Sequence, residues 1–70
     1  MYPTTEQIHA LQLLLNREQA RLARLDQTGQ EQLLDDAFTQ VGYEPDWAEW
    51  HRWAAAFLPA HRQRQYEDAG

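Results

Sequence analysis

Three helix-start signals lie in the sequence, and an apolar pattern of helical spacing follows each of them. Residues 4–7, 28–31 and 46–49 each begin with Thr or Asp and carry Gln or Glu three positions later. This spacing is typical of a capping box, in which the two side chains accept hydrogen bonds from each other's backbone N–H groups. No segment shows the alternation with period two that a half-buried strand requires. The sequence therefore predicts an all-α fold.

Three helices are expected, over about residues 4–26, 29–41 and 46–58. Gly42 should end the second helix, because glycine readily adopts the left-handed conformation that closes a helix. Pro59 should end or kink the third, since its ring clashes with the preceding turn. Short connections favour antiparallel neighbours, so we expect a helical hairpin or bundle with one long, one short and one tryptophan-rich helix.

The chain is short for a stable core. Its 70 residues predict a single helical domain over residues 1–70, in which residues 59–70 form a polar tail that frays. A domain of this size buries only about 60% of its unfolded surface. Cysteine is absent, which excludes disulfides and thiolate zinc sites as a source of stability. Association of chains is the remaining common remedy.

The first helix carries a heptad pattern, which favours a helix pair. Its positions a and d are occupied by Ile8, Leu11, Leu15, Glu18, Leu22 and Leu25. Together with the small size of the chain, this pattern predicts a homodimer through the first helix. Glu18 is the polar member of the seam. It lies either at the rim, or opposite Arg17 or Arg21 of a second chain, where it would set the register.

Aromatic residues are concentrated in and before the third helix. One stripe at helical spacing contains Trp47, Trp50, Ala54, Phe57 and Leu58. Trp50 and Phe57 lie in the middle of this stripe, so we expect them in the core. Trp53 lies at its edge and Tyr43 in the preceding loop. Because Trp and Tyr are enriched at the centres of protein interfaces, these two residues are candidates for partner binding.

The segment from Asp26 to Glu49 contains seven acidic residues and no basic one. Capping explains some of these carboxylates, but not Asp35, Asp36 and Glu44. These three either form a solvated face or present a negative patch to a basic partner. The whole chain has 11 acidic and 6 basic residues, a formal charge of −5, which disfavours direct binding to nucleic acid or to an anionic membrane.

Nothing in the sequence indicates catalysis. The three histidines, His9, His51 and His61, share no i, i+4 spacing and have no neighbouring cysteine, so we expect no metal site. The glycines stand singly, which gives no phosphate-binding loop, and no nucleophile lies in a recognisable motif. We therefore expect no enzyme activity and no cofactor. The N-terminal residues lack the features of a signal peptide, so a cytoplasmic location is expected.

These observations favour a small acidic module that binds a larger protein and modulates or inhibits it. All six basic residues are arginine, as in proteins from GC-rich genomes, which suggests a phage or mobile-element accessory protein. Two alternatives remain open. The first alternative is an acidic mimic that blocks a nucleic-acid-binding protein. The second is a structural subunit of a homo-oligomer.

Overall fold

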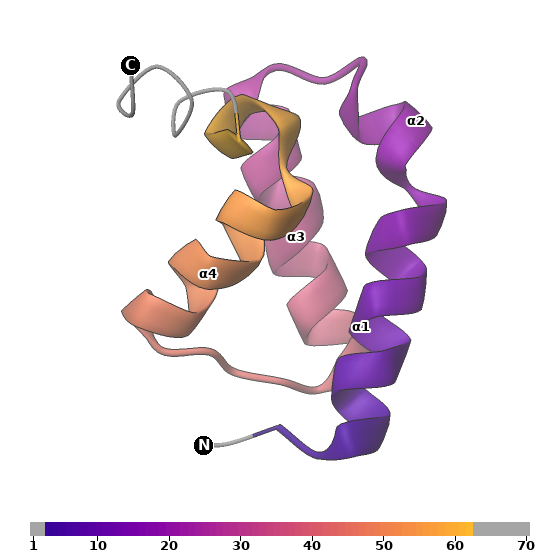
Figure 1. Ribbon diagram of the computed structural model, residues 1–70, viewed down its shortest axis with the longest axis vertical. Helices are drawn as coiled ribbons and strands as arrows, with labels where there is room; N and C mark the ends of the chain where they lie inside the picture. The colour runs from indigo at the N-terminus through magenta and orange to yellow at the C-terminus, as the bar shows by residue number, and fades with distance from the viewer. Residues whose placement is uncertain (1–2, 63–70) are drawn as a thin grey trace.

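The computed structural model describes residues 3–62, which are helical apart from short connections (Figure 1). The helices are α1 (Thr5–Arg17), α2 (Gln19–Leu22), α3 (Gln27–Val41) and α4 (Trp47–Phe57). A further helical turn covers residues 59–62. This part of the chain contains no strand, so the predicted all-α class is confirmed. The number of helical segments is larger than the three that we predicted.

Two of the predicted helix starts have the expected caps. The Thr4 side chain accepts a hydrogen bond from the Gln7 backbone N–H at 3.1 Å. The Gln7 side chain accepts from the Thr4 N–H at 2.9 Å, which completes the capping box. At α4, the Asp46 carboxylate accepts from the Glu49 N–H at 2.8 Å. Each cap satisfies a backbone donor that has no partner inside the helix.

The start of α3 differs from the prediction. Asp26, rather than Thr28, is the N-cap, and its carboxylate accepts a hydrogen bond from the Gly29 N–H at 2.8 Å. Aspartate is the stronger N-cap of the two residue types, and its negative charge also interacts favourably with the helix dipole. As a result α3 begins at Gln27, two residues before the expected position.

Both predicted helix stops are present. Gly42 has a φ of 77° in the left-handed region and closes α3 through N–H bonds to the carbonyls of Phe38 and Thr39. Leu58 has extended backbone and ends α4. Pro59 then begins the next helical turn, where a missing N–H costs nothing.

The predicted long first helix is interrupted at Glu18, between α1 and α2. The side-chain amide of Gln19 donates to the Leu15 carbonyl at 3.1 Å and to the Phe57 carbonyl at 3.0 Å. It thereby connects the break to the end of α4. Residues 23–26 form the connection to α3 instead of the last helical turn that we expected.

The heptad leucines belong to the core of the chain itself. Leu11, Leu15 and Leu22 are all 0% exposed. The other fully or nearly buried apolar residues are Leu34, Ala37, Phe38, Tyr43, Ala54 and Leu58. The structure therefore differs from the predicted dimer seam, because its central leucines already pack against α3 and α4. Ile8, Glu18 and Leu25 are only half-buried, so a dimer on this face would have to use the margin of the seam.

Gln30 fixes the turn after Pro59. It is 4% exposed, and its amide donates to the carbonyls of Leu22 and Leu25, both at 3.0 Å. Its oxygen accepts from the Ala60 N–H at 2.9 Å. Residues 59–62, the first part of the segment predicted to fray, form a helical turn held in this way. The remainder of that predicted tail, residues 63–70, lies outside the described part of the chain.

Candidate partner-binding site

Trp47 is the most exposed residue of the aromatic stripe. It is 76% exposed. It is the first residue of α4, and Figure 1 shows this end of α4 at the outer edge of the molecule. Farther along the same stripe, Ala54 and Leu58 are fully buried, while Trp50 and Phe57 are half-buried. Trp50 and Phe57 pack against the core, whereas Trp47 lies outside it.

Tyr43 was predicted to bind a partner, but it lies in the core and is only 3% exposed. Its ring packs edge-to-face on Phe38, with centroids 5.4 Å apart. Its hydroxyl donates to the Glu49 carboxylate at 3.4 Å. The loop position of Tyr43 suggested an accessible ring, whereas the ring packs against Phe38 and its hydroxyl reaches Glu49 of α4. Burial is the largest cause that raises the pKa of this phenol, followed by the negative charge of Glu49.

This raised pKa predicts a loss of stability in alkali. The folded state holds the phenol proton more tightly than the unfolded state, whose pKa is near 10. The stabilisation is therefore complete below about pH 10 and is lost as the pH rises through the folded-state pKa. Tyr43→Phe should flatten the decline in unfolding free energy above about pH 10 in urea melts. An equal decline in unfolding free energy in wild type and in Tyr43→Phe would contradict this assignment.

Trp53 was the second aromatic candidate for partner binding. It is half-buried, with its ring stacked on Phe57 at 5.5 Å and edge-on to Phe38 at 6.4 Å. Part of the ring lines a shallow depression together with Gln12 and Arg52. Its contacts therefore join α4 to the core, and only part of its surface is exposed.

The three predicted patch carboxylates are exposed, but they do not line one depression. Asp35 accepts a hydrogen bond from the Trp50 indole N–H at 2.8 Å and faces α4. Asp36 lines a groove on the other side of α3. Glu44 lies in a small recess beside Phe38 and Tyr43. Adjacent positions on a helix are about 100° apart, which separates Asp35 from Asp36.

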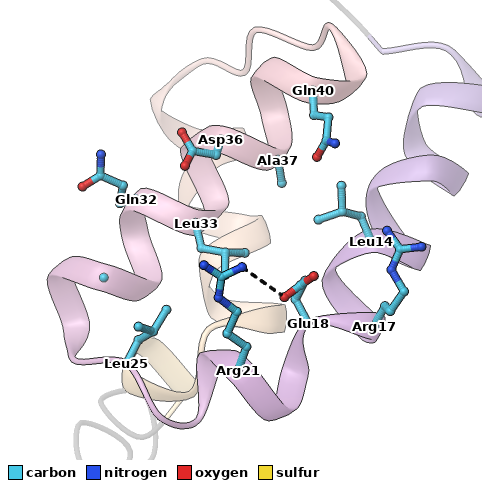
Figure 2. A pocket seen from close by; sticks show the side chains of 11 residues that line it. Leu14, Arg17, Glu18, Arg21, Leu25, Gln32, Leu33, Asp36, Ala37 and Gln40 are labelled. Atoms are coloured by element: carbon cyan, nitrogen blue, oxygen red, sulfur yellow. Dashed lines mark ion pairs between the residues drawn. The ribbon is translucent and has the colours of Figure 1, made fainter.

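The groove beside Asp36, here called the leucine groove, lies between α3 and the α1–α2 segment (Figure 2). It has a volume of about 440 Å³, with Leu14, Leu25 and Leu33 among its lining residues. Its charged lining has both signs. Arg21 lies 3.8 Å from Glu18 in an ion pair, and Arg17 extends from α1 nearby (Figure 2).

A second groove, here called the tryptophan groove, lies between α3, the loop before α4, α4 itself and the turn at residues 59–62. Its volume is about 500 Å³. It is lined by Gln27, Glu31, Asp35, Pro45, Asp46, Trp47, Trp50, His51 and His61. The sequence analysis had assigned only one of these residues, Asp35, to partner binding.

The α4 side of this groove is a cluster of aromatic rings. Trp47 and Trp50 are nearly parallel, with ring centroids 6.1 Å apart. The His51 ring contacts Trp47 edge-on at 4.3 Å. The His61 ring lies 5.7 Å from Trp50, so four rings form a continuous surface.

The α3 side holds these rings in place through two carboxylates one helical turn apart. Glu31 lies 2.8 Å from His61 Nε2, and Asp35 accepts the Trp50 indole hydrogen bond. An i, i+4 spacing places both carboxylates on one face of α3. The i, i+4 spacing of Glu31 and Asp35 could have suggested a shared acidic face. Nothing in the sequence indicated that His61 would contact that face.

No set of three or more His, Cys, Asp or Glu side chains in residues 3–62 is arranged to hold a metal ion. None of the helices in this range combines the length and the apolar character needed to cross a membrane. No protein-family model matches the chain, and no curated protein or solved structure is significantly similar to it.

Proposed function

We propose that this protein is a small interaction module that binds another protein through the tryptophan groove. The observation that carries the proposal is Trp47, which exposes 76% of its surface beside a groove of about 500 Å³. Burying an indole against a partner removes a large apolar area from water. Tryptophan is also among the residues that dominate binding energy in protein interfaces.

The groove is already organised in the free chain, which favours binding. Trp50 is held by its hydrogen bond to Asp35 and by its stacking with Trp47. His61 is held against Glu31, and Gln30 fixes the turn that carries it. A partner would therefore lose little free energy in ordering these side chains.

The leucine groove supports the same function less well. None of its lining residues is a large aromatic, and its charged residues include both signs. Two of them, Arg21 and Glu18, already pair with each other across 3.8 Å. The separate positions of Asp35, Asp36 and Glu44 likewise give no support to a nucleic-acid mimic that relies on these three carboxylates.

Affinity purification with single variants tests the proposed site. Wild-type protein, Trp47→Ala and Leu13→Ala would be used as bait in extracts of the cells that produce the protein. Leu13 is a matched control, because it is 70% exposed but lies on α1, away from the groove. We expect one protein to bind wild type and Leu13→Ala and to be at least tenfold reduced on Trp47→Ala, since hot-spot truncation costs about 2 kcal/mol or more.

Two results would contradict the proposal. Equal recovery on all three baits would place the binding surface elsewhere. Recovery of further copies of the same chain, with no second protein, would instead favour the structural homo-oligomer. Circular dichroism of the variants checks that each is folded, as the exposure of both substituted residues leads us to expect.

A further inference from the structure

The tryptophan groove combines aromatic rings with carboxylates. Asp35 and Asp46 line it, Glu31 lines it in contact with His61, and the described lining residues include neither arginine nor lysine. The leucine groove differs in this respect, because Arg17 and Arg21 line it together with its acidic groups. A positively charged ligand is therefore favoured in the tryptophan groove.

The exposed indole of Trp47 also favours a positively charged ligand. The face of a tryptophan ring attracts a cation placed within about 6 Å of its centre, and tryptophan is the strongest of the aromatic residues in this interaction. Trp47 is accessible over most of its surface and lies beside Asp46, the N-cap of α4. Asp35 and Asp46 line the same groove, so the groove offers a cation both an aromatic ring and carboxylates.

We propose that the group bound in the tryptophan groove is an arginine side chain from a basic segment of the partner protein. This inference rests on the proposed function. A guanidinium is planar, so it can stack on the indole of Trp47 and donate sideways to a carboxylate. Asp35 can accept such a bond. Its Oδ1 is used by the Trp50 indole, whereas Oδ2 makes no hydrogen bond with the described residues.

Lysine fits the same groove less well. An ammonium group is a compact, strongly hydrated charge and cannot stack as a flat group on an indole. Arginine also keeps more of its hydrogen-bond geometry when it is desolvated against an aromatic surface. The expected order of affinity is therefore arginine, then lysine, then citrulline, which has nearly the shape of arginine but no charge.

Titration with short peptides tests this inference by nuclear magnetic resonance. The probes are three peptides of the same glycine-rich sequence with arginine, lysine or citrulline at the central positions. The indole N–H signals report the location of binding. Those of Trp47 and Trp50 should shift on adding the arginine peptide, whereas Trp53, which packs on Phe38 and Phe57, should not. A pH of about 8 keeps free histidine neutral.

Single variants separate the contribution of the Trp47 ring to the affinity for the arginine peptide from that of the Asp35 carboxylate. Trp47→Ala should weaken the arginine peptide by about threefold to thirtyfold, and Trp47→Phe by less. Asp35→Asn should weaken it by about twofold to fivefold. Asp36→Asn is the matched control, because it removes the same charge from the neighbouring residue, which lines the leucine groove. It should leave the affinity nearly unchanged.

Several results would overturn the inference. These are equal binding of the arginine and citrulline peptides, equal losses from Asp35→Asn and Asp36→Asn, or equal shifts of all three indole signals. Binding of the lysine peptide as tight as that of the arginine peptide would reject a stacked guanidinium. If affinity purification still yields a partner that depends on Trp47, the proposed function stands and only its arginine ligand fails. If neither experiment depends on Trp47, both fail.

Discussion

Phe38→Ala is expected to lower the free energy of unfolding by about 3–5 kcal/mol, as for other buried aromatic residues. Phe38 is 3% exposed and lies where three elements meet. Its ring has edge-on contacts with Tyr43 of the loop and Trp53 of α4, and it belongs to α3 itself. Truncation would leave a cavity between these rings, which a small domain cannot easily collapse.

The loss of unfolding free energy in Phe38→Ala should be large enough to measure without a long extrapolation. A small domain has a total stability of only about 5–10 kcal/mol, so most of it would be removed. Urea melts followed by circular dichroism measure the change. Leu13→Ala serves as the control, because Leu13 is 70% exposed and should change stability by less than about 0.5 kcal/mol. If the two variants lost equal stability, Phe38 would not occupy the centre of the core.

Gln30→Leu is the second substitution with a large expected effect, although it replaces a buried polar side chain by an apolar one of similar size. The change removes three hydrogen bonds, two to the carbonyls of Leu22 and Leu25 and one from the Ala60 N–H. The Leu22 carbonyl keeps its bond from the Leu25 N–H, so the Leu25 carbonyl and the Ala60 N–H are the groups that lose their partner. Each buried backbone group left without a partner costs about 1–3 kcal/mol. We expect a total loss of about 2–5 kcal/mol, because water can reach some of these groups.

The matched control for this substitution is Gln32→Leu. Gln32 is two residues away on the same helix and is exposed, so its replacement should cost little. Amide hydrogen exchange adds a local measure, since the Ala60 N–H should exchange faster in Gln30→Leu than in wild type. A variant as stable as wild type, with unchanged exchange at Ala60, would show that these hydrogen bonds do not hold the turn.

The helix boundaries could be predicted where a single residue determines the backbone. Thr4 and Asp46 cap their helices as expected, Gly42 closes α3, and α4 ends before Pro59. These outcomes depend on local chemistry within a few residues. The start of α3 was misplaced because Asp26 and Thr28 are both good caps, and local sequence does not decide between them.

Heptad spacing could not distinguish an internal seam from a dimer seam. Leu11, Leu15 and Leu22 have the correct period for either arrangement, since both bury the same face of a helix. The partner of that face depends on how the chain folds back. Here α3 and α4 cover it, so the leucines are fully buried within one chain.

The glutamines show a second limit of prediction from the sequence. Their side chains are compatible with a helix at almost any exposed position, so their number indicates nothing about tertiary structure. Yet Gln7 reaches the end of α3 and donates to the carbonyls of Val41 and Gly42, and Gln19 and Gln30 bridge other helix ends. These partners are remote in sequence, so only the folded chain reveals them.

The candidate site was missed for a related reason. The spacing of Trp47 on the aromatic stripe predicts burial, but its exposure depends on its place at the outer end of α4. His51 and His61 have no informative spacing in sequence. The turn at residues 59–62 brings His61 to Trp50 and Glu31, and this turn depends in part on the buried Gln30.

Photo-crosslinking from inside the groove tests most directly whether this surface binds another protein. A benzoylphenylalanine residue would replace Trp47 in one variant and Leu13 in another, each produced in the cells that normally make the protein. Both positions are largely exposed, so the probe should leave the fold intact. We expect a discrete adduct with a second protein from position 47 and none, or a much weaker one, from position 13. Adducts of equal yield from both positions, or an adduct from position 13 alone, would contradict the assignment of the tryptophan groove as the binding surface.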